Sequence, residues 1–221
     1  TKFGKNLIGS FYQPKMVLAD INSLDSLPPR EVLAGYAEVV KYGLISDVSF
    51  FGWLEKNGQA LCSGNVALRQ SAVKTSCQAK ATIVSEDERE GGIRALLNLG
   101  HTFAHALEAE TGFGNTILHG EAVAVGATLA HELSAATGLC PIEDARRVKE
   151  HYRAVGLPAS PADIASVDWQ AEALISHMGS DKKVKDGRLT FILTRGIGKA
   201  FVTNDVALED IRKILASSIS A

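Results

Sequence analysis

The chain has 221 residues, of which 46% are hydrophobic, and a formal net charge of -2 at pH 7. This size and apolar content allow one large domain or two small ones with a substantial core. Without a basic excess, nucleic-acid binding is not expected. The three cysteines form no Cys-x-x-Cys pair, which argues against a disulfide framework and a thiolate zinc site. Their pattern predicts a reducing, cytoplasmic setting. We expect no membrane contact, because we find neither a signal peptide nor an apolar run long enough to span a bilayer.

The first 24 residues combine loop signals with one short apolar run. Glycines and Pro14 mark loops, and residues 16–19 predict a short buried strand. No neighbouring strand follows, so we expect its sheet partners to lie outside this chain. Lys5 and Asn6 stand beside glycines and could bind an anion, but their spacing alone favours a solvated loop.

The first predicted helix begins at the two prolines before Arg30 and runs to about Ile45. It is apolar nearly all round, which indicates a buried helix. Glu38 and Lys41 are the exceptions, and since they are three apart they share one face. Buried charges need partners. Two interpretations stay open: an internal ion pair, or Glu38 on a metal ion and Lys41 on a substrate oxygen. Gly35 and Gly43 indicate close approach of another backbone.

The rest of the chain is mostly helical in pattern. Lys80 lies among small apolar residues, and we expect its stem to carry the charge out to solvent. The runs 189–193 and 200–203 flank a glycine turn and predict a β-hairpin. Further helices are predicted at residues 50–60, 65–84, 121–137, 142–155, 168–178 and 205–219.

Three of the six histidines fall within residues 96–121. His101 and His105 are four apart and share one helical face, and His119 opens the next apolar run. A single histidine is more often a hydrogen-bonded core residue or a helix cap than a ligand. For His101 and His105 alone, a structural role and a ligand role are about equally supported. The third histidine favours a metal or acid–base site. Spacing alone indicates His101 and His105 as ligands, with further groups coming from elsewhere in the chain.

Together these motifs closely resemble the 3-dehydroquinate synthase family, and the resemblance runs from Gly4 to the hairpin. One departure is Ala104, where the family often has glycine. The resemblance implies a mainly α, multi-helical domain of the dehydroquinate synthase-like fold with a small β-hairpin near the C-terminus. It makes residues 25–221 the metal- and substrate-binding domain and residues 1–24 the end of an N-terminal nucleotide-binding domain that is otherwise absent. The motifs that carry it are residues 35–43, 97–108, 119–121 and 181–183.

The resemblance also implies residue roles. It makes Glu38, His101 and His119 the ligands of a divalent metal ion, zinc or cobalt, which corrects the spacing-based assignment of His105. His105 becomes a substrate contact and proton-transfer group. Lys5 and Glu31 match positions near an NAD cofactor. The remaining matches are substrate contacts at Lys41, Lys80, Arg94, Asn98 and either Lys182 or Lys183, and a phosphate contact at Asn6.

The implied reaction converts 3-deoxy-D-arabino-heptulosonate 7-phosphate to 3-dehydroquinate in the shikimate pathway. NAD transiently oxidises a ring hydroxyl, which acidifies the neighbouring C–H. Phosphate is then eliminated, the ketone is reduced back, the ring opens and an aldol step closes the carbocycle. The intact enzyme is expected to be a homodimer, and this chain alone is expected to be inactive. The alternatives are a related sugar-phosphate cyclase, a metal-dependent alcohol dehydrogenase and a non-catalytic metal-binding domain.

Overall fold

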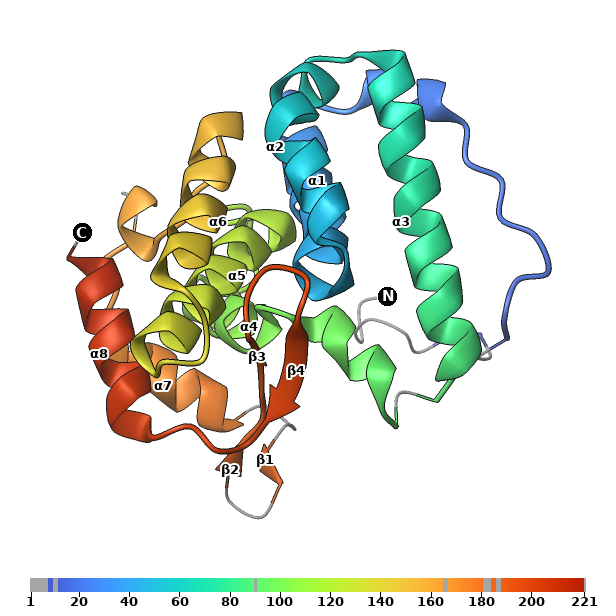
Figure 1. The fold of residues 1–221 in the computed structure, drawn as a ribbon. Coiled ribbons are helices and arrows are strands. Elements are labelled where there is room, and N and C mark those ends of the chain that lie inside the picture. The colour runs from blue at the N-terminus through green and yellow to red at the C-terminus, as the bar shows by residue number, and fades with distance from the viewer. Residues whose placement is uncertain are drawn as a thin grey trace.

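A computed structural model of the chain describes residues 8–9, 12–89, 91–164, 167–180, 184–185 and 188–220. Helices dominate this part of the chain, as predicted (Figure 1). No helix in it is both long and apolar enough to cross a bilayer. The α-helices are α1 (Pro29–Ser46), α2 (Val48–Cys62), α3 (Val66–Glu86), α4 (His101–Glu110), α5 (His119–Ala136), α6 (Ile142–Val155), α7 (Ala171–Ser180) and α8 (Leu208–Ile219), and the 3-10 helices are η1 (Ile21–Ser26), η2 (Ile93–Asn98) and η3 (Pro161–Asp163).

Helix α5 forms the centre of the core. Its residues 122–130 are small or apolar and fully buried, so every side of the helix packs against protein. Helices α1, α4, α6 and α8 surround it. The α4–α5 crossing is close, because a Cβ at Gly126 would lie 2.2 Å from the carbonyl oxygen of Gly100. Gly100 also has a φ of +81°, which favours glycine, and it directly precedes α4.

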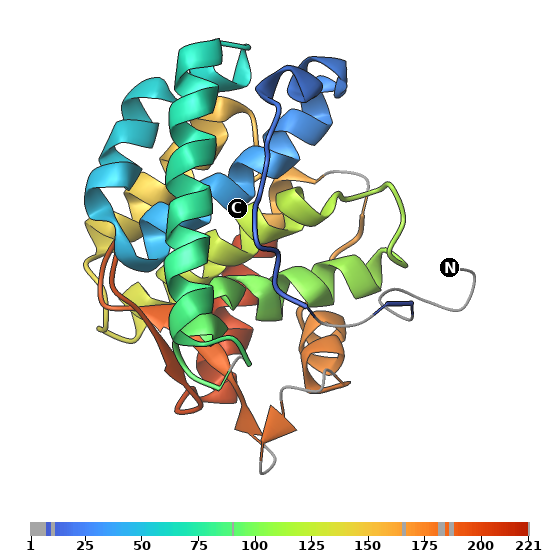
Figure 2. The same cartoon turned by 90° about the vertical axis from the view of Figure 1, so that its right-hand side faces the viewer.

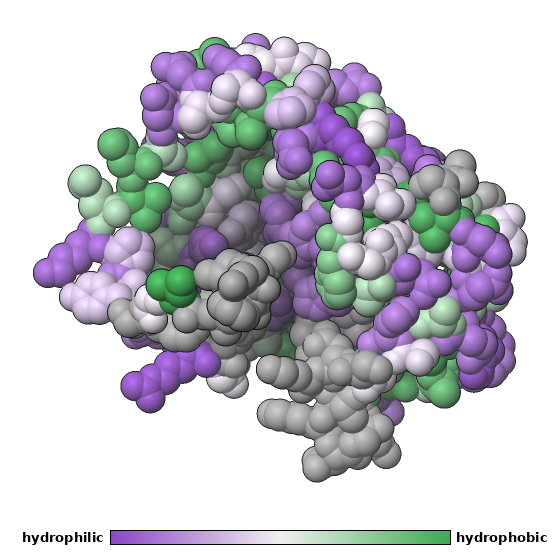
Figure 3. Space-filling view, turned by 180° about the vertical axis from the view of Figure 1, so that it is seen from behind, coloured by the Kyte–Doolittle hydropathy of each residue, from purple (hydrophilic) through white to green (hydrophobic). Residues whose placement is uncertain are grey.

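Helix α3 stands apart from this body, at the right of Figure 1, and packs against α1, α2, η1 and η2. It buries only Arg69, Ala72 and Ile83. Seen from behind, the molecule has a hollow beside α3 whose floor is hydrophilic (Figure 3). The fold therefore leaves a polar recess next to a compact helical core.

The hairpin predicted near the C-terminus is confirmed. Strands β3 (Phe191–Thr194) and β4 (Ala200–Thr203) pair antiparallel, with Phe191 opposite Thr203. A shorter pair, β1 (Val184–Lys185) and β2 (Arg188–Leu189), precedes it. Hairpin β3–β4 packs on α5 and η2, next to the start of α4.

The prediction of a buried strand at residues 16–19 is wrong. This segment is extended but exposed, and Leu18 has 88% of its surface accessible. Figure 2 shows it running along the outside of the helices. No strand in the described part of the chain pairs with it, and an apolar run becomes a buried strand only where a sheet accepts it.

Candidate metal and substrate site

Three side chains from three helices converge at one point. Glu38 comes from the middle of α1, whereas His101 and His119 are the first residues of α4 and α5. Glu38 Oε1 lies 3.3 Å from His119 Nε2 and 4.0 Å from His101 Nε2. One donor atom from each residue lies within 4.8 Å of the other two. Two donors on a tetrahedral zinc ion are about 3.4 Å apart, so the spacing fits one ion.

Hydrogen bonds orient both imidazoles toward the carboxylate. His101 Nδ1 donates to the carbonyl oxygen of Leu99 at 3.3 Å, and His119 Nδ1 donates to Glu108 Oε1 at 3.1 Å. Each ring therefore turns Nε2 toward Glu38. Metal-binding histidines usually have such partners on the second nitrogen, which fix the tautomer and raise ligand basicity. The donor set and its surroundings thus fit a divalent metal ion.

The pKa values of two of the three donors favour cation binding at neutral pH. Burial would raise the pKa of Glu38, but its hydrogen bond to His119 and the charge of Lys41 lower it to about 2. Burial and the charge of Lys41 lower the pKa of His101 to about 3. Hydrogen bonds to Glu108 and Glu38 raise the pKa of His119 to about 9. Two donors are therefore already deprotonated, and only His119 must release a proton.

Lys41 contacts the other oxygen of the same carboxylate. Its Nζ lies 2.5 Å from Glu38 Oε2, and its side chain is almost fully buried. Burial lowers the pKa of Lys41, the carboxylate of Glu38 opposes this shift, and the charge of Lys80 adds to it. The ion pair foreseen from the sequence thus exists. It leaves Glu38 Oε1 facing the histidines, so both interpretations of the pair fit the same geometry.

The other predicted side chains lie at different distances from this centre. His105 is one turn further along α4, with its ring centroid 5.5 Å from that of His101, and it lies outside the ligand cluster. Lys80 is exposed on α3 but close enough to act on Lys41. Asn98 ends η2 and lines a cavity of about 960 Å³ between η2 and hairpin β3–β4.

Two further predicted residues, Arg94 and Glu31, belong to η2 and α1. Arg94 Nη1 donates to the backbone carbonyl of Glu88, in the loop after α3. Glu31 is exposed on the first turn of α1. The predictions for Lys5, Asn6 and Lys182, with its neighbour Lys183, fall outside the described residues.

The sequence reasoning missed the roles of Glu108 and Arg30. Glu108 follows His101 by seven residues and so shares its helical face, which is the signal that could have indicated it. Arg30 Nε contacts Glu121 Oε1 at 2.6 Å, beside the start of α5. No local pattern could indicate that contact, because the two residues are 91 positions apart.

The family model described as 3-dehydroquinate synthase C-terminal matches residues 35–184, and the corresponding N-terminal model matches residues 1–34. The chain belongs to the 3-dehydroquinate synthase family. A relative named 3-dehydroquinate synthase from Rhodospirillum rubrum is 54% identical over the whole chain, and one from a Jannaschia species is 56% identical over 98% of it. The chain spans 57% and 59% of the lengths of these two curated relatives.

Solved structures confirm the dehydroquinate synthase-like fold. A 2-epi-5-epi-valiolone synthase from Streptomyces hygroscopicus, solved with NAD+ and Zn2+, matches with a TM-score of 0.82 at 26% identity, over 100% of this chain and 60% of the other. A 2-deoxy-scyllo-inosose synthase complexed with carbaglucose-6-phosphate, NAD+ and Co2+ matches with a TM-score of 0.80 at 26% identity, over 97% and 60% of the two chains. Members of the dehydroquinate synthase-like fold thus include sugar-phosphate cyclases.

Proposed function

We propose that this chain supplies the metal- and substrate-binding part of a 3-dehydroquinate synthase. The enzyme is an NAD- and metal-dependent lyase that converts 3-deoxy-D-arabino-heptulosonate 7-phosphate to 3-dehydroquinate and phosphate. The observation that carries the proposal is the convergence of Glu38, His101 and His119 in a chain 54% identical to an enzyme of that name. Since the chain spans under two thirds of such relatives, we propose that turnover needs further residues and that these 221 alone are inactive.

The three donors would hold a zinc or cobalt ion and leave coordination positions for substrate oxygens. The bound ion would supply Lewis-acid polarisation of the hydroxyl that NAD oxidises. Lys41 keeps Glu38 ionised through its 2.5 Å contact and can donate a further hydrogen bond to a substrate oxygen. His105 follows His101 by one turn, so it can hold and return a proton beside the same substrate.

Positive charge near this centre suits a phosphate-bearing substrate. The charge of Lys80 lowers the pKa of Lys41, so the two ammonium groups are close to each other. This supports the proposal that both contact the same anionic ligand. We propose that Lys80, Arg94 and Asn98 contact the substrate. The same role for Lys182, the phosphate contact of Asn6 and the cofactor contacts of Lys5 and Glu31 stay predictions, as does a homodimer of the intact protein.

The proposal is tested with the complete protein, NAD and zinc. We expect phosphate release from the heptulosonate phosphate, loss of release after chelation, and recovery with zinc or cobalt. His101→Ala should reduce metal content from about one ion per chain to near zero. His177→Ala is the matched control. The Nε2 atom of His177 lies 2.8 Å from Glu110 Oε2, and neither residue belongs to the ligand cluster. An active, chelator-resistant protein would contradict the metal role.

The likeness to solved cyclases favours one second candidate, a related sugar-phosphate cyclase. Identity of 54–56% to relatives named 3-dehydroquinate synthase, against 26% to those cyclases, makes it the weaker one. Parallel assays with the heptulosonate phosphate and with glucose 6-phosphate, the sugar that carbaglucose-6-phosphate imitates, separate the two. Turnover of glucose 6-phosphate alone would replace our assignment with this candidate.

A further inference from the structure

Helix α1 meets the beginning of α5 over three successive turns. Three residues of α1, four positions apart, share one face of the helix. They contact three consecutive residues of α5 in reverse order. The pairs are Arg30–Glu121, through two hydrogen bonds; Ala34–Gly120, through direct backbone packing; and Glu38–His119, at the metal site.

The first of these pairs is a clamp, which we define as Arg30, Glu121 and the backbone carbonyls of Asn115 and Thr116. Arg30 Nε and Nη2 donate to the two oxygens of Glu121 at 2.6 and 2.7 Å. Its Nη1 and Nη2 also donate to the two carbonyls, each at 3.1 Å. Glu121 Oε2 in turn accepts from the backbone N–H of Leu118 at 2.8 Å. One guanidinium thereby fixes the chain on both sides of His119.

His119 depends on such fixing more than the other histidine ligand does. Its side chain is 47% exposed, against 11% for His101, so packing restrains it little. It follows an exposed loop at residues 112–116, which begins with positive φ angles at Gly112 and Phe113. The Glu121 side chain is only 13% exposed and the Arg30 side chain is 49% exposed, so the pair is partly buried, and its charge-assisted bidentate bonds are stronger than a single surface contact.

We propose that the Arg30–Glu121 clamp positions His119 for metal binding. Both residues are positioning residues, since neither belongs to the ligand cluster. The inference rests on the proposed metal site, and it assigns to the clamp the role of holding His119 in the position that metal binding requires. It predicts that breaking the clamp weakens metal binding beyond what the loss of stability explains.

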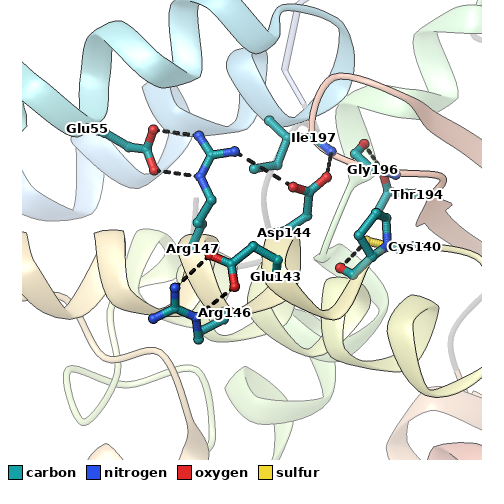
Figure 4. A network of polar contacts seen from close by, with 10 residues as sticks. Glu55, Cys140, Glu143, Asp144, Arg146, Arg147, Thr194, Gly196 and Ile197 are labelled. Carbon is teal, nitrogen blue, oxygen red and sulfur yellow. Dashed lines mark hydrogen bonds and ion pairs between the residues drawn. The ribbon is translucent and has the colours of Figure 1, made fainter.

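The test is a Co2+ titration of the metal-free complete protein, followed by visible absorption. Arg30→Gln and Glu121→Gln should each weaken Co2+ binding about tenfold, the lower end of the effect for direct hydrogen-bond partners of metal ligands, because the clamp acts on His119 only through the backbone on either side of it. Arg147 and Glu55 provide the matched control. They form the same bidentate pair, at 3.1 and 2.7 Å, between α6 and α2 (Figure 4). Arg147→Gln and Glu55→Gln should change Co2+ affinity less than about twofold, because substitutions at surface positions away from a site have only small effects.

A second measurement separates positioning from general stabilisation. Urea unfolding of each metal-free variant gives its stability, so variants of equal stability can be compared. Arg30→Lys keeps the charge but not the planar fork, so it should recover only part of the lost affinity. Wild-type Co2+ affinity in both Arg30→Gln and Glu121→Gln would overturn the clamp, as would equal losses in the control pair.

His101→Ala distinguishes this failure from failure of the proposed function. Loss of Co2+ binding in His101→Ala, together with wild-type binding in both Arg30→Gln and Glu121→Gln, rejects the clamp alone. Wild-type binding in His101→Ala rejects the metal site and the clamp with it. Should Arg30→Gln fail to fold, Glu121→Gln decides, because its amide oxygen can still accept from Leu118.

Discussion

A methyl group at position 120 should push apart the two helices that carry Glu38 and His119. A Cβ on Gly120 would lie 1.9 Å from the carbonyl oxygen of Ala34, whereas ordinary contacts begin near 3.4 Å. Helices α1 and α5 would have to separate by about 1.5 Å, or the core would have to deform. We expect Gly120→Ala to reduce the free energy of unfolding by about 2–3 kcal/mol.

The same movement should weaken metal binding. The gap between Glu38 Oε1 and His119 Nε2 would widen from 3.3 Å to about 4–5 Å, beyond the spacing of two donors on one zinc ion. Urea unfolding and Co2+ titration of the metal-free protein measure both effects. Gly35→Ala is the control, because a Cβ there meets nothing within 4 Å and helix propensity should add about 0.5–1 kcal/mol of stability. Unchanged stability and affinity in Gly120→Ala would refute the idea that this backbone contact sets the ligand spacing.

Three further predictions concern His119. Glu108→Gln removes the charged partner of its Nδ1, so the pKa of His119 should fall below 9 and Co2+ affinity should drop about 10–100-fold, with Glu110→Gln as the control. The folded-state pKa of about 9 lies above the unfolded value of 6.5, so this interaction stabilises the metal-free protein fully below pH 6.5 and is lost as pH rises through 9. Urea unfolding from pH 6 to 10 should show this loss, and His119→Ala should not. At pH 7.5 each bound ion should displace about one proton, measured by calorimetry in buffers of different ionisation enthalpy; none, or two, would contradict the assignment.

The helices could be predicted because their apolar patterns are long and their ends carry clear signals. Helix α1 begins at Pro29, as the paired prolines indicate, and α6 ends at Val155 before Gly156. The apolar run at residues 16–19 lacks such support. Composition shows that it suits a strand, but only a partner strand decides whether it is buried, and the described residues contain none.

The site was predictable only in part, because helical periodicity describes one helix at a time. Spacing joined His101 with His105, which share a face of α4. In the structure, the residue beside His101 and Glu38 is His119, from the next helix. That arrangement depends on how α4 and α5 cross, which only the resemblance to a known family indicated. The glycines show the same limit: a Cβ at Gly43 would lie 2.9 Å from the backbone nitrogen of Phe51, as the predicted close approach requires, whereas a Cβ at Gly35 would meet nothing within 4 Å.

The proposed metal site would also link metal binding to the packing of the core. Each of its two histidines has a glycine beside it in sequence, and both glycines lie against the backbone of another helix. Gly100 precedes His101 and packs on Ala127, whereas Gly120 follows His119 and packs on Ala34. Any side chain at either glycine must therefore disturb the core and the ligand spacing together. An exposed residue such as Lys80 carries no such constraint, so its replacement should alter ligand binding without altering stability.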